Sequence, residues 1–137
     1  QIKYITDDKL TNKYVQIILD ELNISIITPH CEKIISNKLI IYKSDIVLFL
    51  RSIHHTYFSN RRFTMKKIIE ILSKITKQII IIEWINDDDA EVIGYLSESE
   101  DDYNKKHFLT ELKTYFTNYK YLDISDRRTR ELYMAWK

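Results

Sequence analysis

The chain has 137 residues, enough for one domain with a buried core, and a formal net charge of +1 from 21 basic and 20 acidic residues. This balance excludes a protein that binds nucleic acid or anionic lipid chiefly by charge. Cys31 is the single cysteine, which excludes an intrachain disulfide and a thiolate metal site. Gly94 is the single glycine, which excludes a glycine-rich phosphate loop within this chain.

Several features bear on location. One lone cysteine fits a reducing compartment, and the first residues show no signal-peptide pattern. The longest apolar runs, at 46–50 and 79–82, are too short to span a bilayer. We therefore predict a cytoplasmic protein without membrane contact. Because the chain does not begin with Met, we expect it to start inside a longer reading frame.

In the first part of the chain, residues 2–6 are predicted as a strand. Apolar residues then recur at helical spacing over 10–22, with Asp8 available as N-cap. Residues 24–28 form a β-branched run that ends at Pro29, which cannot donate to a sheet. The segment 31–43 fits either a short helix or a loop.

The second part has a clearer pattern. Residues 45–50 and 79–84 are apolar on both faces, as buried strands between helices are. Residues 65–75 and 108–116 carry helical apolar stripes, and Thr64 is a plausible cap for the first. Residues 86–102 are acidic and polar, which predicts a loop with one helical turn at most. Residues 121–124 and 131–136 are predicted strands, joined by a connection short enough for a hairpin.

Strands separated by helices imply parallel pairing with right-handed crossovers. The sequence therefore predicts one α/β domain over residues 1–137. We expect a Rossmann-like, mostly parallel sheet with helices on both faces and an antiparallel C-terminal β-hairpin. The basic residues Arg127, Arg128 and Arg130 are assigned to a surface loop rather than to a phosphate site.

The segment 45–55, DIVLFLRSIHH, resembles the fourth strand and following loop of class I S-adenosylmethionine-dependent methyltransferases. Residues 66–84 are similar to the helix and fifth strand that follow there, and 108–136 to the closing α-β-β unit. The resemblance covers 45–137. It implies methyl transfer from S-adenosylmethionine to an unidentified acceptor.

Upstream, the resemblance makes residues 2–7 the family's second strand, with Asp7 or Asp8 binding the cofactor ribose through two carboxylate oxygens. It places Cys31 and Glu32 near the adenine, and Arg51 at the strand end that faces the cofactor. Other readings stay open. Either aspartate fits a helix N-cap equally well, and a lone cysteine is commonly a small buried hydrophobe.

His54 and His55 follow the end of a buried strand, where open α/β sheets place their ligands. On an extended segment adjacent side chains point to opposite sides, so one histidine would face the site while the other packs. A histidine there could orient or deprotonate a methyl acceptor. The alternative is a purely structural pairing in the loop.

No metal site is predicted, because no His-x-x-His or His-Glu-x-x-His spacing occurs and an acidic run such as 87–89 is typical of a solvated loop.

The chain departs from the family at its start. The family's central first strand and its glycine-rich turn have no counterpart before residue 1. We expect a piece of a larger enzyme, completed by a missing N-terminal segment or a partner chain, that binds S-adenosylmethionine weakly by itself. The rival is a non-catalytic pseudo-methyltransferase domain used for binding or scaffolding. A flavodoxin-like receiver ranks last, because it does not explain the terminal hairpin.

Overall fold

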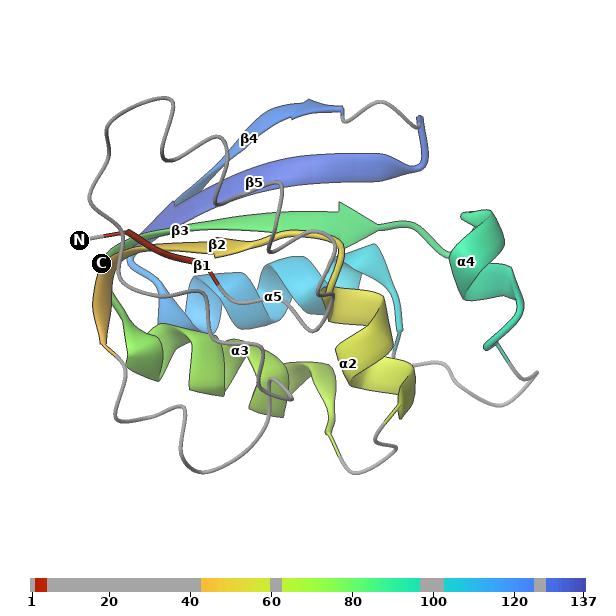
Figure 1. Cartoon of the computed structure of the whole chain (residues 1–137), viewed down its shortest axis with the longest axis horizontal. Helices are drawn as coiled ribbons and strands as arrows, with labels where there is room; N and C mark the ends of the chain where they lie inside the picture. The colour runs from red at the N-terminus through yellow and green to blue at the C-terminus, as the bar shows by residue number, and fades with distance from the viewer. Residues whose placement is uncertain (1, 5–42, 60–62, 97–102, 125–127) are drawn as a thin grey trace.

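The computed structural model describes residues 2–4, 43–59, 63–96, 103–124 and 128–137 (Figure 1). This part of the chain contains both strands and helices. The elements are β1 (Ile2–Tyr4), β2 (Ser44–Phe49), α2 (Ile53–Ser59), α3 (Met65–Ile75), β3 (Thr76–Ile85), α4 (Ala90–Ile93), α5 (Lys105–Tyr115), β4 (Asn118–Ile124) and β5 (Arg130–Trp136). The predicted helix over 10–22 and the predicted strand over 24–28 lie outside the described residues.

The strands form one sheet in the order β1-β2-β3-β5-β4. β1, β2 and β3 are parallel, whereas β5 is antiparallel to both β3 and β4. This confirms the predicted parallel strands at 2–6, 45–50 and 79–84. It also confirms that the strand predicted over 131–136 lies antiparallel beside β3, with β4 at the outer edge. The prediction of a mostly parallel sheet is only partly right, since two of the four described pairings are antiparallel.

β1 pairs directly with β2, with Ile2 opposite Ile46 and Tyr4 opposite Leu48. The resemblance makes residues 2–7 the family's second strand and expects the family's first strand at the centre of the sheet. Direct hydrogen-bonded pairing leaves no room for a strand between them. β1 therefore occupies the position expected for that central strand.

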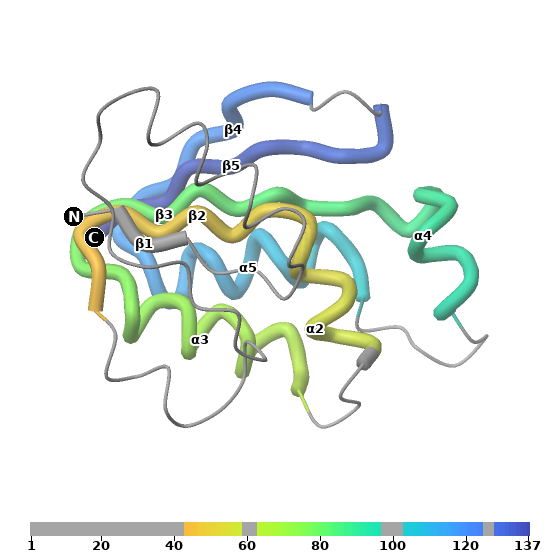
Figure 2. The backbone as a smooth tube through the Cα atoms, viewed as in Figure 1, coloured from red at the N-terminus to blue at the C-terminus, as the bar shows by residue number. Residues whose placement is uncertain are grey.

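The two longest described helices lie on the same side of the sheet, as Figure 2 shows. α3 packs against both α5 and β3. Thr64 caps α3 as predicted, because its side chain accepts a hydrogen bond from the backbone N–H of Lys67 at 3.2 Å. Helices on both faces were expected, but the described α3 and α5 cover one face.

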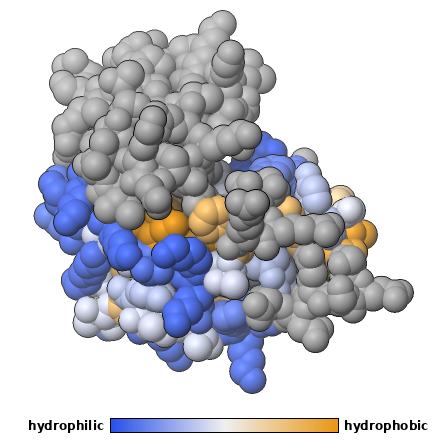
Figure 3. Space-filling view, turned by 90° about the horizontal axis from the view of Figure 1, so that it is seen from below, coloured by the Kyte–Doolittle hydropathy of each residue, from blue (hydrophilic) through white to orange (hydrophobic). Residues whose placement is uncertain are grey.

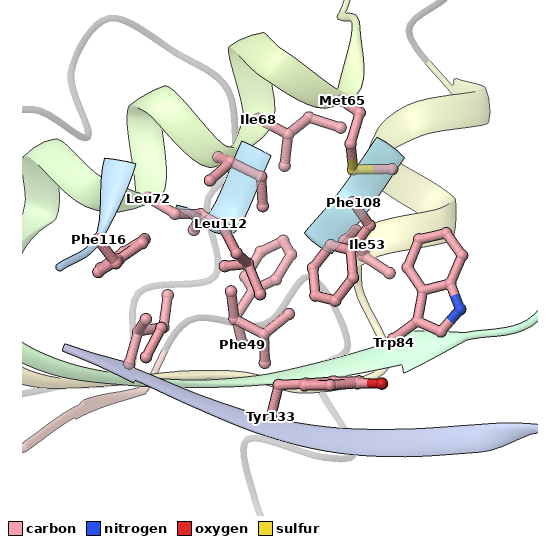
Figure 4. Packing of buried hydrophobic residues seen from close by; sticks show 14 of the residues in the cluster. Phe49, Ile53, Met65, Ile68, Leu72, Trp84, Phe108, Leu112, Phe116 and Tyr133 are labelled. Atoms are coloured by element: carbon pink, nitrogen blue, oxygen red, sulfur yellow. The ribbon is translucent and has the colours of Figure 1, made fainter. Parts of the chain in front are cut away.

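The core lies between this helix pair and the sheet (Figure 4). Its largest members are aromatic, and the rings of Trp84 and Phe108 stack with centroids 4.9 Å apart. The residues of the core with almost no exposed surface include Phe49, Ile53, Met65, Ile68, Leu72, Ile80, Ile82, Trp84, Phe108 and Leu112. The strand residues among them belong to the segments predicted as buried strands.

On the face of the molecule drawn in Figure 3, the described side chains are largely hydrophilic, with apolar areas between them. On α3, the carboxylate of Glu70 forms ion pairs with Lys67 and Lys74. None of the helices among the described residues is both long and apolar enough to cross a membrane.

Candidate functional site

The carboxyl ends of β2 and β3 lie side by side, because these strands are parallel neighbours. From there the chain continues into α2 after β2 and into α4 after β3 (Figure 1). This edge of an open α/β sheet is where ligands bind. The predicted site residues Arg51, His54 and His55 all lie here, on the segment that follows β2.

His54 and His55 lie in the first turn of α2, so the prediction of an extended segment is wrong. The Ser52 carbonyl starts the helix by accepting from the Thr56 N–H at 2.9 Å. The two imidazole rings lie 3.9 Å apart between centroids. His54 is completely buried, at 0% exposure, and His55 is partly exposed. One histidine therefore packs inside while the other reaches the surface.

Glu91, on α4, completes this cluster from the neighbouring strand end. Its Oε2 lies 3.2 Å from His54 Nε2. Its Oε1 pairs with a guanidinium nitrogen of Arg130 at 3.0 Å and with one of Arg51 at 3.6 Å. The two carboxylate oxygens thus have different neighbours: Oε2 faces the histidine and Oε1 faces the arginines.

The Arg130 guanidinium is buried as well, at 3% exposure, and is held by Asp89, which is 1% exposed. Asp89 accepts from Arg130 Nε at 2.9 Å and from the Thr129 hydroxyl at 2.6 Å, and it caps α4 by accepting from the Glu91 N–H at 2.9 Å. The surface loop predicted for Arg130 and the solvated loop predicted for Asp89 are therefore wrong. Both residues meet in one buried ion pair.

The charge states follow from burial and contacts. Burial, followed by repulsion from His55, lowers the pKa of His54 from 6.5 to about 4, although the contact with Glu91 opposes this shift. Burial raises the pKa of Glu91, but the hydrogen bond and charge of Arg130 outweigh it and leave that pKa lowered. At neutral pH, a neutral imidazole thus faces a carboxylate. His54 is consequently a weak general base.

The tautomer of His54 is fixed by its partner. A carboxylate can only accept, so Nε2 carries the proton and donates it to Glu91 Oε2. The other ring nitrogen, Nδ1, is buried without a hydrogen-bond partner among the described residues. His54 therefore has an acceptor lone pair that its described neighbours do not use.

Arg51 connects β2 to α2 with a φ of 54°, the left-handed region that non-glycine residues rarely adopt. Its N–H donates to Oε2 of Glu83, a buried residue of β3, at 2.7 Å. Its side chain is 64% exposed. The Glu83 carboxylate thus binds the backbone of the strained turn, while the Arg51 guanidinium is exposed to solvent at the predicted site.

This strain predicts an unusual order of stability at position 51. Both Arg51→Gly and Arg51→Ala lose the exposed ion pair with Glu91, but only glycine adopts a φ of 54° without strain. We expect the glycine variant to be more stable than the alanine variant by about 1 kcal/mol. Urea denaturation of both variants measures the difference. At positions with an ordinary negative φ, an alanine variant is more stable than a glycine variant. If Arg51→Ala were more stable than Arg51→Gly, the turn would not be strained.

The other predicted site residues, Asp7, Asp8, Cys31 and Glu32, lie outside the described residues. Of the predicted catalytic pair, the structure brings His54 and His55 together and adds Glu91. Sequence reasoning missed Glu83, Asp89, Glu91 and Arg130. One signal was available for Glu83, which is the single acid inside the apolar run 79–85. An isolated carboxylate in a buried strand needs a polar partner.

No protein-family model matches the chain, and no curated protein matches its sequence. Solved structures do match. A crystal structure of monomeric WbdD superposes with a TM-score of 0.63 and 13% identity, covering 97% of this chain and 30% of that one. Another WbdD structure, described as a bifunctional kinase-methyltransferase, gives a TM-score of 0.60 at 13% identity, with 97% and 29% coverage.

Two further methyltransferase structures are similar. Magnesium protoporphyrin IX methyltransferase (ChlM) from Synechocystis PCC 6803, with bound S-adenosylmethionine, gives a TM-score of 0.53 at 11% identity, covering 98% of this chain and 58% of that one. The CMeT domain of the citrinin polyketide synthase gives 0.57 at 8% identity, with 97% and 38% coverage. This chain thus spans about a third to somewhat over half of these structures. At such identities the likeness shows the fold alone, a mixed α/β fold shared with these structures.

Proposed function

We propose that this chain is a domain, or a piece of one, that transfers a methyl group from S-adenosylmethionine to an unidentified acceptor. The observation that carries the proposal is the fold, which matches several methyltransferase structures over 97–98% of the chain. When bound, the cofactor supplies an electrophilic methyl group. The chain's own residues would hold this methyl group in line with the acceptor atom, and the bond to sulfur would break, with its electron pair left on sulfur, as the methyl group is transferred.

The chain's contribution would be proximity and orientation rather than strong base catalysis. His54 is a weak base and His55 is partly exposed at the same edge of the sheet. His55 would therefore contact the acceptor, and His54 would keep it in position. A proton released from the acceptor would pass to solvent. Arg51 is on the same edge and would contact the cofactor, together with Asp7 or Asp8, Cys31 and Glu32 on the upstream part.

A specific observation favours a second function, binding or scaffolding without catalysis. β1 takes the position beside β2 expected for the family's central strand, and the residues that follow it in the sequence contain no glycine before Gly94. A turn without glycine does not let the backbone approach the methionine part of the cofactor closely. Loss of several charge-assisted hydrogen bonds, at about 1.5–3 kcal/mol each, would move a micromolar site toward millimolar affinity.

Titration calorimetry with S-adenosylmethionine distinguishes these functions. We expect weak binding, near the millimolar range, by this chain. The enzyme requires that residues encoded upstream supply the missing contacts although β1 already lies beside β2, so a longer protein that includes them should then bind in the micromolar range. Asp8→Asn in the longer protein would weaken binding if that carboxylate holds the ribose. Asp123→Asn, at an exposed position on β4, is the matched control. Absence of binding by both proteins would contradict the enzyme and favour the scaffold, whereas micromolar binding by this chain would show that the cofactor needs no glycine-rich turn.

A further inference from the structure

The cluster of His54, His55 and Glu91 has the composition of a metal site. Each residue offers one ligand atom, and the three atoms all lie within 4.8 Å of one another. We propose that these side chains bind one divalent transition-metal ion of the zinc type. This inference stands apart from the proposed methyl transfer, since it depends only on the geometry of α2 and α4.

The spacing of the donor atoms fits a shared ion. His54 Nε2 and Glu91 Oε2 lie 3.2 Å apart. Two ligands on one tetrahedral zinc, each about 2.0–2.2 Å from the metal, are separated by about 3.3 Å. His55 is partly exposed beside His54, and its donor atom lies within 4.8 Å of the other two. Two imidazoles and one carboxylate leave a fourth position for water or a substrate oxygen.

The surrounding charges orient the carboxylate of Glu91. Arg130 and Arg51 both pair with Glu91 Oε1, whereas Oε2 faces His54. The charge of Arg130 is balanced by Asp89, and the charge of Arg51 is screened, because its side chain is 64% exposed. Hydrogen bonds to the second oxygen of a ligating carboxylate are typical of the shell around a metal.

The burial of His54 holds its donor atom in place. Its ring is completely buried and Nε2 already lies beside Glu91 Oε2, so two of the three donors are positioned before an ion binds. Imidazole nitrogen favours zinc, cobalt or nickel over magnesium and calcium, which prefer oxygen ligands.

Titration of the metal-free protein with Co²⁺ tests the site, because tetrahedral cobalt absorbs visible light. We expect one Co²⁺ per chain, displaced by Zn²⁺ and not by Mg²⁺. Glu91→Gln and His55→Ala should each weaken Co²⁺ binding by about tenfold or more, since each removes a donor. His55 is partly exposed, so its variant tests the site even if Glu91→Gln does not fold, which circular dichroism checks.

The matched control is His107→Gln on α5. His107 contacts Glu111 at the same 3.2 Å, but this pair has only two donors from one helix. Binding of Co²⁺ should be unchanged in this variant. No visible absorption up to millimolar Co²⁺, equal binding by wild type and both site variants, or equal loss in the His107 variant would each overturn the metal site.

Discussion

Replacing Asp89 by asparagine, or Arg130 by methionine, is expected to lower the free energy of unfolding by about 3–5 kcal/mol. Both side chains are almost fully buried, and two hydrogen bonds join them, at 2.9 and 3.3 Å. Removal of one partner leaves the other charge buried without its main counter-charge, which is far more costly than loss of an exposed pair. Urea denaturation monitored by circular dichroism measures the loss.

Lys77→Met provides the control, because it breaks an exposed pair with Asp45 at 3.6 Å. It should cost less than about 1 kcal/mol. The double variant Asp89→Asn/Arg130→Met should lose less stability than the sum of the single variants, since it removes both buried charges together. Equal losses in the Lys77 and Asp89 variants would mean that the Asp89–Arg130 pair behaves as an exposed one.

Acidification gives a second test of the same pair. Burial raises the pKa of Asp89, but the hydrogen bonds from Arg130, Thr129 and the Glu91 backbone outweigh this effect and hold the pKa well below its ordinary value of 3.8. A carboxyl group with a lowered pKa stabilises the fold above its unfolded pKa, and that stability is lost as pH falls through the folded pKa. The difference between wild type and Asp89→Asn should therefore shrink below about pH 4.

The sequence could predict the second half of the fold because its periodicity is strong. Residues 65–75 keep an apolar stripe over three turns, and 79–84 are apolar except for Glu83, so element type followed from local pattern. The antiparallel position of β5 followed from the resemblance and the short connection. The position of β1 did not, because strand order depends on long-range pairing that no local pattern encodes.

The site was predictable only in part, for a physical reason. His54 and His55 are adjacent in sequence and follow a recognisable strand, so their place at the sheet edge could be inferred. Glu91 lies 37 residues away and Arg130 about as far beyond it. An acidic run and a basic cluster, each read alone, are typical of solvated surface. Only the pairing of β3 with β5 brings the two segments together and buries Asp89 with Arg130.

Substitutions in the aromatic core next to the site are expected to destabilise the fold as much as loss of the Asp89–Arg130 ion pair. Phe108 is fully buried between the ring of Trp84, stacked at 4.9 Å, and the ring of Tyr133, in an edge contact at 5.5 Å. Phe108→Ala should lower the free energy of unfolding by about 3–5 kcal/mol, because it removes buried apolar area and leaves a cavity. Thermal and urea denaturation measure this loss. Phe108→Leu, which keeps most of the volume, should cost clearly less.

Phe108→Ala should also affect the site, because Phe108 packs against Trp84. The indole N–H of Trp84 donates to Asn86 Oδ1 at 2.8 Å, and the Tyr103 ring stacked on it donates its hydroxyl to the Ile85 carbonyl at 2.7 Å. These bonds fix the end of β3, from which the chain continues to Asp89 and Glu91. Phe108→Ala should therefore weaken Co²⁺ binding at the His54, His55 and Glu91 cluster, although Phe108 lies on α5 and the donors lie on α2 and α4. Ile93→Ala is the control, because Ile93 is 59% exposed and its loss should change stability by less than about 0.5 kcal/mol. Unchanged metal affinity in a folded Phe108→Ala protein would show that the aromatic core does not position the site.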